Sequence, residues 1–177
     1  MGRQPGGFFS PGLAGSDAWV SHGPDGGYVT ALAIDPLIPT TLYAGMHDGG
    51  VFKSTDCGLH WNAARSGLTS LKINALVVTY GRSVDPTAPA SLYAMTQDSG
   101  VFKSTDSGSN WSAANNGLDN STVFVLAIDP QQAGSLIAGT ALGGVFASNT
   151  FGASWTGHSN GLPIHSPRSP GESATTW

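Results

Sequence analysis

Short apolar runs, each closed by glycine, proline or polar turn residues, set the pattern of this sequence. The first run, at 28–34, contains β-branched residues and stops at the turn signal that begins with Asp35. Three further runs follow at 42–46, 50–54 and 60–64. Runs of about four to eight residues between turn signals are typical of strands. This stretch is therefore predicted to form four β-strands.

The same succession of runs and turns occurs three times along the chain. Each copy places a tryptophan 26 residues after an Asp-Pro pair, and a glycine six residues after that tryptophan. The tryptophans are Trp61, Trp111 and Trp155. The strands expected in the second and third copies lie at 73–80, 91–95, 100–104, 110–114, 123–128, 135–139, 144–148 and 154–157. A constant period of this kind indicates stacked copies of one supersecondary unit.

Repeats of four short strands fit the blades of a β-propeller. A blade is an antiparallel sheet that packs against its neighbours because it cannot bury both faces alone. We therefore predict an all-β chain that forms a partial β-propeller, with about three four-stranded antiparallel blades plus a degenerate N-terminal half blade. The expected boundaries are 1–27 for the degenerate partial blade, 28–68, 69–118 and 119–162 for blades 1, 2 and 3, and 163–177 for a disordered tail.

The number of blades predicts an incomplete ring, because closed propellers typically need about 4 to 8. The chain is expected either to be a fragment of a longer propeller or to be completed by a second chain. The segment after Leu162 has no alternating pattern, which favours the fragment. An open stack exposes apolar faces and strand edges at its ends. Self-association that completes the ring is therefore a further expectation.

Composition narrows the range of functions. Charged residues make up 10% of the chain, below the roughly 25% of typical soluble domains, and the net charge is −4. The seven Lys and Arg residues are scattered, so we expect no nucleic-acid partner. No apolar run reaches the roughly 18 residues of a membrane span, and the first residues lack the apolar segment of a signal peptide. The five histidines and single cysteine lack metal-ligand spacing, so neither a metal nor a cofactor is predicted.

A shorter motif recurs between the third and fourth strands expected in each repeat. The first two copies fit Ser-x-Asp-x-Gly-x-x-Trp, and Thr150 takes the place of the aspartate in the third. This motif resembles the Asp-box, or BNR repeat, and the resemblance covers about residues 28–162. It implies a hairpin in each blade, with structural roles for Ser54, Asp56, Gly58, Trp61, Ser104, Asp106, Gly108, Trp111, Ser148, Gly152 and Trp155.

The chemistry of the motif favours a structural interpretation. A short carboxylate in a turn accepts hydrogen bonds from backbone N–H groups, and glycine adopts a positive φ at little cost. Catalysis requires unlike groups that converge on one point, whereas Asp56 and Asp106 recur in register. We interpret these aspartates as ties within hairpins. The tryptophans are interpreted as packing residues that cover the hairpins, rather than as a stripe for stacking sugars.

Asp-box propellers include sialidases, xyloglucanase-like glycosidases, photosystem II assembly factor-like proteins and sortilin-type receptors. A sialidase-like site would require an arginine cluster, an acid, and a tyrosine nucleophile paired with a glutamate. The single glutamate of this chain is Glu172, in the expected tail. Sialidase activity is therefore rejected for this chain.

The xyloglucanase resemblance is closer. The segment 42–50 is similar to the one that carries a catalytic aspartate in that family, and the aligned position is His47, followed by Asp48. The second copy has Gln97 and then Asp98. Asp48 and Asp98 are the fallback catalytic candidates for the alternative function, a glycosidase of the xyloglucanase type acting on β-glucans. The alternative is a purely structural role, in which both are ordinary polar residues of hairpin loops.

The favoured function is non-catalytic, a scaffold or binding surface for a protein or glycan ligand at the propeller mouth. Propeller ligands usually sit where the loops between strands converge. The loops expected there contain His47, Asp48, Gln97, Asp98, Ala141 and Leu142, with Arg82 in an insertion from Gly81 to Val84. The family resemblance favours a secreted or cell-surface location.

Overall fold

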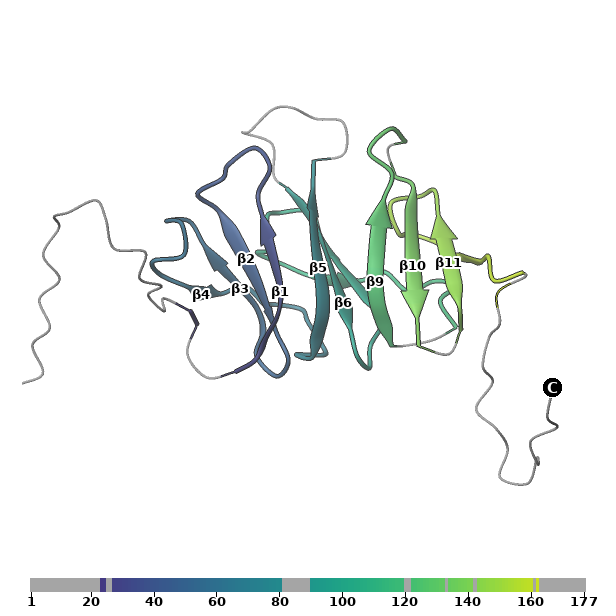
Figure 1. Cartoon of the computed structure of the whole chain (residues 1–177), viewed down its shortest axis with the longest axis horizontal. Coiled ribbons are helices and arrows are strands. Elements are labelled where there is room, and N and C mark those ends of the chain that lie inside the picture. The colour runs from purple at the N-terminus through teal and green to yellow at the C-terminus, as the bar shows by residue number, and fades with distance from the viewer. Residues whose placement is uncertain are drawn as a thin grey trace, which may run out of the picture.

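Three four-stranded antiparallel sheets stand side by side in the computed structural model (Figure 1). The structure describes residues 23–24, 27–80, 90–119, 122–132, 134–141, 143–160 and 162. These residues contain no helix, and therefore no helix that is long and apolar enough to cross a bilayer. The predictions for residues 1–22, for the insertion with Arg82, for Leu142 and for the tail at 163–177 fall outside the described residues.

Each repeat forms one sheet, and within each sheet every strand pairs with the next one in the chain. Blade 1 consists of β1 (Val29–Ile34), β2 (Leu42–Met46), β3 (Gly50–Ser54) and β4 (Asn62–Ala63). Blade 2 consists of β5 (Ile73–Thr79), β6 (Ser91–Thr96), β7 (Val101–Ser104) and β8 (Ser112–Ala113). Blade 3 consists of β9 (Val123–Ile128), β10 (Leu136–Thr140), β11 (Val145–Ser148) and β12 (Thr156–Gly157). The predicted all-β partial β-propeller is confirmed, while the limits of the blades along the chain remain predictions.

The middle strands are buried on both faces because the sheets stack against one another. In β6 of the middle blade, Tyr93 is 1% and Ala94 0% exposed although successive side chains point to opposite faces of a strand. Tyr93 packs in the apolar cluster shared with blade 3, and Ala94 in the cluster shared with blade 1. The near-continuous apolar runs of the second strands follow from this double coverage.

The fourth strands are shorter than the sequence predicted. Strands expected at 60–64, 110–114 and 154–157 are reduced to the two-residue strands β4, β8 and β12. The amide of Trp111 donates to the Ser66 carbonyl of blade 1 at 2.9 Å, and the amide of Trp155 donates to the Asn116 carbonyl of blade 2 at 2.8 Å. Because these two amides bond to a neighbouring blade, they do not join the ladders of β8 and β12; β4 is equally short, although no such bond of Trp61 is seen among the described residues.

Two apolar seams join the three blades. The later blade contributes a leucine from its first strand, a phenylalanine from its third strand and the motif tryptophan; these residues are Leu76, Phe102 and Trp111 in the first seam, and Leu126, Phe146 and Trp155 in the second. The earlier blade contributes Tyr43 and Val51, or Tyr93 and Val101. The two seams therefore bury equivalent positions of the repeat.

A polar latch closes each seam. The Tyr43 hydroxyl and the Lys53 ammonium of blade 1 both donate to the Ser107 carbonyl of blade 2, at 3.2 and 3.1 Å. The corresponding residues of the second seam are Tyr93, Lys103 and Phe151, with distances of 3.1 and 3.2 Å. Burial raises the pKa of both tyrosines to about 12. Their hydroxyls therefore stay protonated and available as donors at neutral pH.

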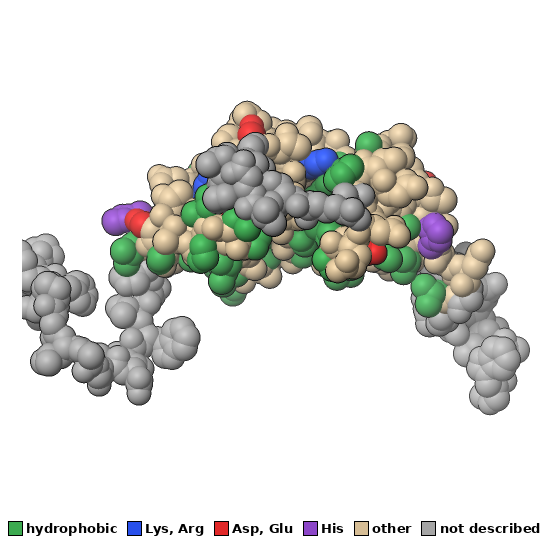
Figure 2. All heavy atoms as spheres, turned by 90° about the horizontal axis from the view of Figure 1, so that it is seen from above, with side chains coloured by type: hydrophobic (Ala, Val, Ile, Leu, Met, Phe, Trp, Pro, Cys, Tyr) green, Lys and Arg blue, Asp and Glu red, His purple; other side chains and the backbone are tan. Residues whose placement is uncertain are grey.

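The ends of the stack expose positions that the seams bury. Leu32 in β1 is 69% exposed, whereas Leu76 and Leu126, at the same register in blades 2 and 3, are 8% and 7% exposed. At the other end, Val125 and Ile137 of blade 3 are 56% and 50% exposed. Figure 2 shows hydrophobic side chains gathered along one long side of the molecule. Self-association through the end faces remains a prediction.

Candidate functional site

The loops between the second and third strands carry the residues that the sequence selected for binding. Each loop begins with the same backbone bond, in which the amides of His47, Gln97 and Ala141 donate to the carbonyls of Tyr28, Lys72 and Thr122, at 2.9, 3.0 and 3.0 Å. The bonded carbonyl lies just before the first strand of each blade. The three loops therefore share one backbone frame, although their side chains differ.

The blade 1 loop presents a histidine and a carboxylate together. His47 Nδ1 lies 2.8 Å from Asp48 Oδ2, and the side chains are 45% and 70% exposed. The guanidinium of Arg65 donates to the Gly49 carbonyl of the same loop at 3.0 Å. This loop can thus offer hydrogen-bond donors and acceptors to a polar ligand from an exposed position.

The blade 2 loop has a different set of groups. Asp98 Oδ2 lies 3.7 Å from Lys72 Nζ, and the side chains are 50% and 45% exposed. The Thr122 hydroxyl of blade 3 donates to the Gln97 carbonyl at 2.5 Å, so the first strand of one blade supports the loop of the blade before it. In blade 3, the described part of the loop presents Ala141 and no charged side chain.

The fallback catalytic carboxylates lie in separate loops on neighbouring blades. Asp48 bonds to a histidine and Asp98 pairs with a lysine. Hydrolysis of a glycoside by paired carboxylates needs two such groups about 5 to 10 Å apart across a cleft. Among the described residues, no group of three or more His, Cys, Asp and Glu side chains is placed to hold a metal ion.

Asp56 and Asp106 lie in the turns that connect the third and fourth strands. Asp56 Oδ1 accepts the His60 amide at 2.9 Å and the Ser54 hydroxyl at 2.7 Å, while His60 Nδ1 lies 2.6 Å from Asp56 Oδ2. The corresponding partners of Asp106 are the amide and side-chain nitrogens of Asn110, at 2.8 and 2.9 Å, and the Ser104 hydroxyl, at 2.7 Å. Both carboxylates are therefore engaged within their own turns.

The third turn keeps this geometry without a charge. Thr150 Oγ1 accepts the Ser154 amide at 3.0 Å and lies 3.2 Å from Ser148 Oγ. Ser148 Oγ also accepts the Gly152 amide at 3.0 Å, as the equivalent serines do in the other turns. A hydroxyl can take over the backbone bond of the carboxylate because both are short acceptors at the same position.

Acid should weaken the Asp106 turn. Hydrogen bonds from the Asn110 side chain and amide, with one from Ser104, lower the pKa of Asp106 to about 2 from an ordinary 3.8. A lowered pKa contributes stability that is complete above about pH 4 and is lost as the pH falls through about 2. In urea unfolding at pH 5 and pH 2, we expect Asp106→Asn to lose less stability than the unmodified chain. The difference should stay below about 1 kcal/mol because solvent screens this exposed turn.

The matched control for this experiment is Asp48→Asn, which alters an exposed carboxylate outside the turns. It should leave the acid-induced loss at that of the unmodified chain. Equal losses in the unmodified chain and the Asp106→Asn variant would contradict the expected contribution of this turn.

The motif tryptophans have two different partners. The indole N–H of Trp111 donates to the Ala64 carbonyl of blade 1 at 2.8 Å, and that of Trp155 donates to the Ala114 carbonyl of blade 2 at 2.8 Å. The indole N–H of Trp61 donates instead to the Gly58 carbonyl in its own turn, at 3.0 Å. Trp111 and Trp155 are 5% exposed. They therefore join blades, a role that the repeat pattern alone did not predict.

Solved structures of longer proteins share this fold. An ancestral GH74 enzyme aligns with a TM-score of 0.62 and 22% identity, covering 74% of this chain and 18% of that one. YCF48 from Cyanidioschyzon merolae aligns with a TM-score of 0.54 and 16% identity, covering 73% and 36% of the two chains. A GH74 enzyme from Niastella koreensis aligns with a TM-score of 0.53 and 23% identity, covering 73% and 22%.

At these identities the likeness shows the β-propeller fold alone, and this chain spans only 18 to 36% of the length of these three proteins. No family model matches the sequence, and a search of curated proteins found no match. The Asp-box assignment therefore remains a prediction from the motif itself.

Three residues near the hairpin loops were missed by reasoning from the sequence. Arg65, Lys72 and Thr122 lie outside the loops in the sequence but contact Gly49, Asp98 and Gln97 in the structure. These positions recur in every blade, but the residue type changes: Arg65 corresponds to Asn115 and Ser159, and Thr122 corresponds to Tyr28 and Lys72. Only the packing of the strands brings them to the loops.

Proposed function

We propose that this chain is a non-catalytic β-propeller module whose hairpin loops form a binding surface for a protein or a glycan. The observation that carries the proposal is the common loop frame described above, which holds different side chains in each blade. A scaffold that fixes the backbone while the loop tips vary is the usual arrangement of binding surfaces.

The polar groups at this surface suit hydrogen bonding to a polar ligand. His47 and Asp48 are displayed by blade 1, and Lys72 and Asp98 by blade 2. Both signs of charge are present, and none of these four side chains is fully buried. Such groups can recognise sugar hydroxyls or the charged rim of a protein partner at little desolvation cost.

A glycan array and a pull-down with the full chain would test this proposal. We expect a ligand to be retained by the unmodified chain and to bind at least about tenfold more weakly when His47, Asp48, Gln97 and Asp98 are all changed to alanine. The matched control is Thr55→Ala with Thr105→Ala, because these exposed threonines lie in the turns at the opposite ends of the third strands. The proposal would be refuted if the control variant lost ligand binding while the loop variant kept it. It would also be refuted if a folded sample of the unmodified chain retained no ligand.

A glycosidase of the xyloglucanase type is the second candidate, and the observation in its favour is the exposed carboxylate in two equivalent loops. Its test is the release of reducing ends from β-glucans by the full chain and by Asp48→Asn with Asp98→Asn. The binding function predicts equal background rates for both samples. A rate that falls to background only in the double variant would establish the glycosidase instead.

A further inference from the structure

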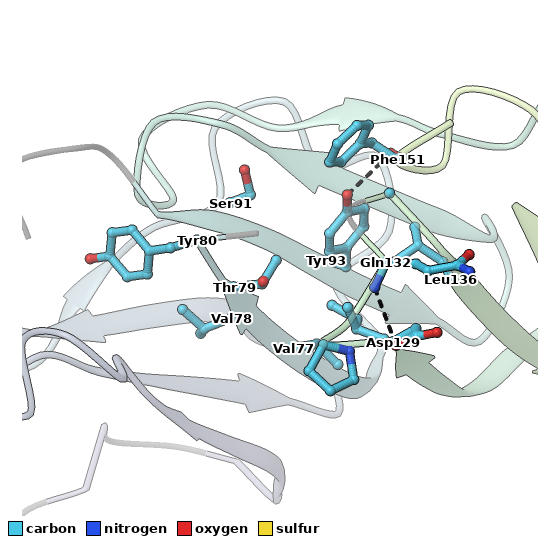
Figure 3. A pocket seen from close by; sticks show the side chains of 13 residues that line it. Val77, Val78, Thr79, Tyr80, Ser91, Tyr93, Asp129, Gln132, Leu136 and Phe151 are labelled. Atoms are coloured by element: carbon cyan, nitrogen blue, oxygen red, sulfur yellow. Dashed lines mark hydrogen bonds between the residues drawn. The ribbon is translucent and has the colours of Figure 1, made fainter. Parts of the chain in front are cut away.

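The seam between blades 1 and 2 is filled by a tyrosine that reaches across it. Tyr80 follows β5 of blade 2 and packs against the apolar cluster of this seam. Its hydroxyl donates to Asp35 Oδ2 of blade 1 at 2.9 Å. In Figure 3, Tyr80 extends away from Tyr93 and Phe151, which border the other seam. A phenol ring and a carboxylate thus close the first seam at the corner between the first and second strands.

The equivalent corner of the second seam lacks both members of this pair. Asp35 and Asp129 occupy one position of the repeat, since their amides bond to the carbonyls of Thr41 and Ser135 in the same way. Thr79 takes that position in blade 2, where it pairs with Ser91. The residues at the next position are Pro36, Tyr80 and Pro130 in blades 1, 2 and 3. The second seam therefore has a threonine where the first has Asp35, and a proline where the first has Tyr80.

A cavity of about 300 Å³ occupies the second seam at this corner. Val77, Thr79 and Tyr93 line it from blade 2, and Ile128, Pro130 and Phe151 line it from blade 3 (Figure 3). We call it the seam pocket. Its volume is at the lower end of the range for pockets that hold small ligands, roughly 300 to 1,000 Å³. Val78 and Tyr80 of blade 2 also line it.

The walls of the seam pocket are suited to an aromatic ring. Tyr93 lines the pocket but is only 1% exposed, and its hydroxyl donates to the Phe151 carbonyl at 3.1 Å. Phe151 and the aliphatic side chains of Val77 and Ile128 add further apolar surface. Aromatic rings pack favourably against one another in offset or edge-to-face arrangements.

Polar groups also line the seam pocket. Asp129 is exposed, and its Oδ1 accepts the amides of Gln131 and Gln132 at 2.7 and 3.3 Å. Ser91 lines the pocket as well. Their side-chain oxygens can accept a hydrogen bond from a ligand hydroxyl.

We propose that the seam pocket binds a 4-hydroxyphenyl group, either as the tyrosine side chain of a partner polypeptide or as a free phenol. The first seam supplies the reason, because the protein itself fills the equivalent space there with a phenol hydrogen-bonded to a carboxylate. The seam pocket and the hairpin loops lie at opposite ends of the second strands. The pocket therefore does not depend on the binding surface proposed above.

Titration of the full chain, followed by amide chemical shifts, tests this assignment. N-acetyl-tyrosinamide and p-cresol represent the two sources of the group, and N-acetyl-phenylalaninamide lacks the hydroxyl. We expect the hydroxylated probes to shift the amides of Thr79 and Phe151 with a Kd on the order of 1 mM, and the phenylalanine probe to bind at least about fivefold more weakly. Tighter binding of the tyrosine amide than of p-cresol identifies a polypeptide source, and the reverse identifies a free phenol. Equal binding of all three, or no shift, would overturn the proposal.

Two variants locate the binding. Thr79→Asp with Pro130→Tyr rebuilds the tyrosine–carboxylate pair of the first seam and should reduce binding at least about tenfold. Gln132→Trp obstructs the pocket from an exposed position and should do the same if the double variant fails to fold. Pro36→Tyr, the same exchange at the equivalent position of blade 1, should leave binding unchanged. If the double variant or Gln132→Trp is folded and still binds the probes undiminished, the proposal is also refuted.

Discussion

Replacing Trp111 by alanine should lower the free energy of unfolding by about 3–5 kcal/mol. The side chain is 5% exposed in the first seam, and its indole N–H bonds to the Ala64 carbonyl of the neighbouring blade. The substitution would leave a cavity at the joint between two sheets and a carbonyl without its donor. Urea unfolding followed by circular dichroism would measure the change.

The matched control is Trp61→Ala, which removes the same residue of the motif from blade 1. Trp61 is only partly buried and bonds within its own turn, so we expect a loss of about 1–2 kcal/mol. Losses of equal size at the two positions would contradict the assignment of Trp111 to the seam. They would show that the tryptophan acts within its hairpin, as the sequence suggested.

Replacing Gly117 by alanine should lower the free energy of unfolding by more than about 3 kcal/mol. Gly117 has a φ of +86°, where a side chain is strained, and an added Cβ would overlap the Trp155 carbonyl oxygen of the next blade. Backbone strain of this kind costs about 1–3 kcal/mol by itself. The carbonyl cannot retreat easily, because the Trp155 amide is bonded to Asn116 and its indole to Ala114.

The control for the steric part is Gly58→Ala. Gly58 has a similar φ of +88°, but the nearest atom to an added Cβ is 3.4 Å away, an ordinary contact. We expect only the backbone strain to act at Gly58, so the free energy of unfolding should fall by roughly 1–2 kcal/mol. If thermal or urea unfolding gave the same loss for both variants, the close approach of the two backbones would not contribute to stability.

Blade 3 lacks the side chains that form the latch in blades 1 and 2. The paired positions Tyr43–Lys53 and Tyr93–Lys103 become Ile137–Ala147 in blade 3. The donors that would reach a following turn are thus replaced by apolar side chains. Whatever covers this face would gain apolar contact but no such bonds.

The sequence predicted the three sheets well because each is built from local pairings. Turn residues separate the strands, and consecutive strands pair, so spacing alone located β2 and β3 exactly at 42–46 and 50–54. It predicted the fourth strands of blades 2 and 3 too long, because the amides of Trp111 and Trp155 bond to residues of another blade. A bond between residues more than 35 positions apart leaves no mark in local pattern.

The candidate sites also divide into features that follow from local sequence and features that arise only from packing. The loops with His47, Asp48, Gln97 and Asp98 could be selected from the sequence because hairpin loops follow from strand spacing. Arg65 and Lys72 could not, since they reach those loops only through packing. The seam pocket was not predicted either, because it arises from the meeting of two blades.

The sequence by itself determined the repeat, the strand order within each blade and the turn chemistry, because these depend on residues close together in the chain. The tertiary structure alone decided which tryptophans join blades, why the glycine six residues after Trp111 is required, and where a cavity opens. These features depend on the distance between sheets, which no local pattern encodes.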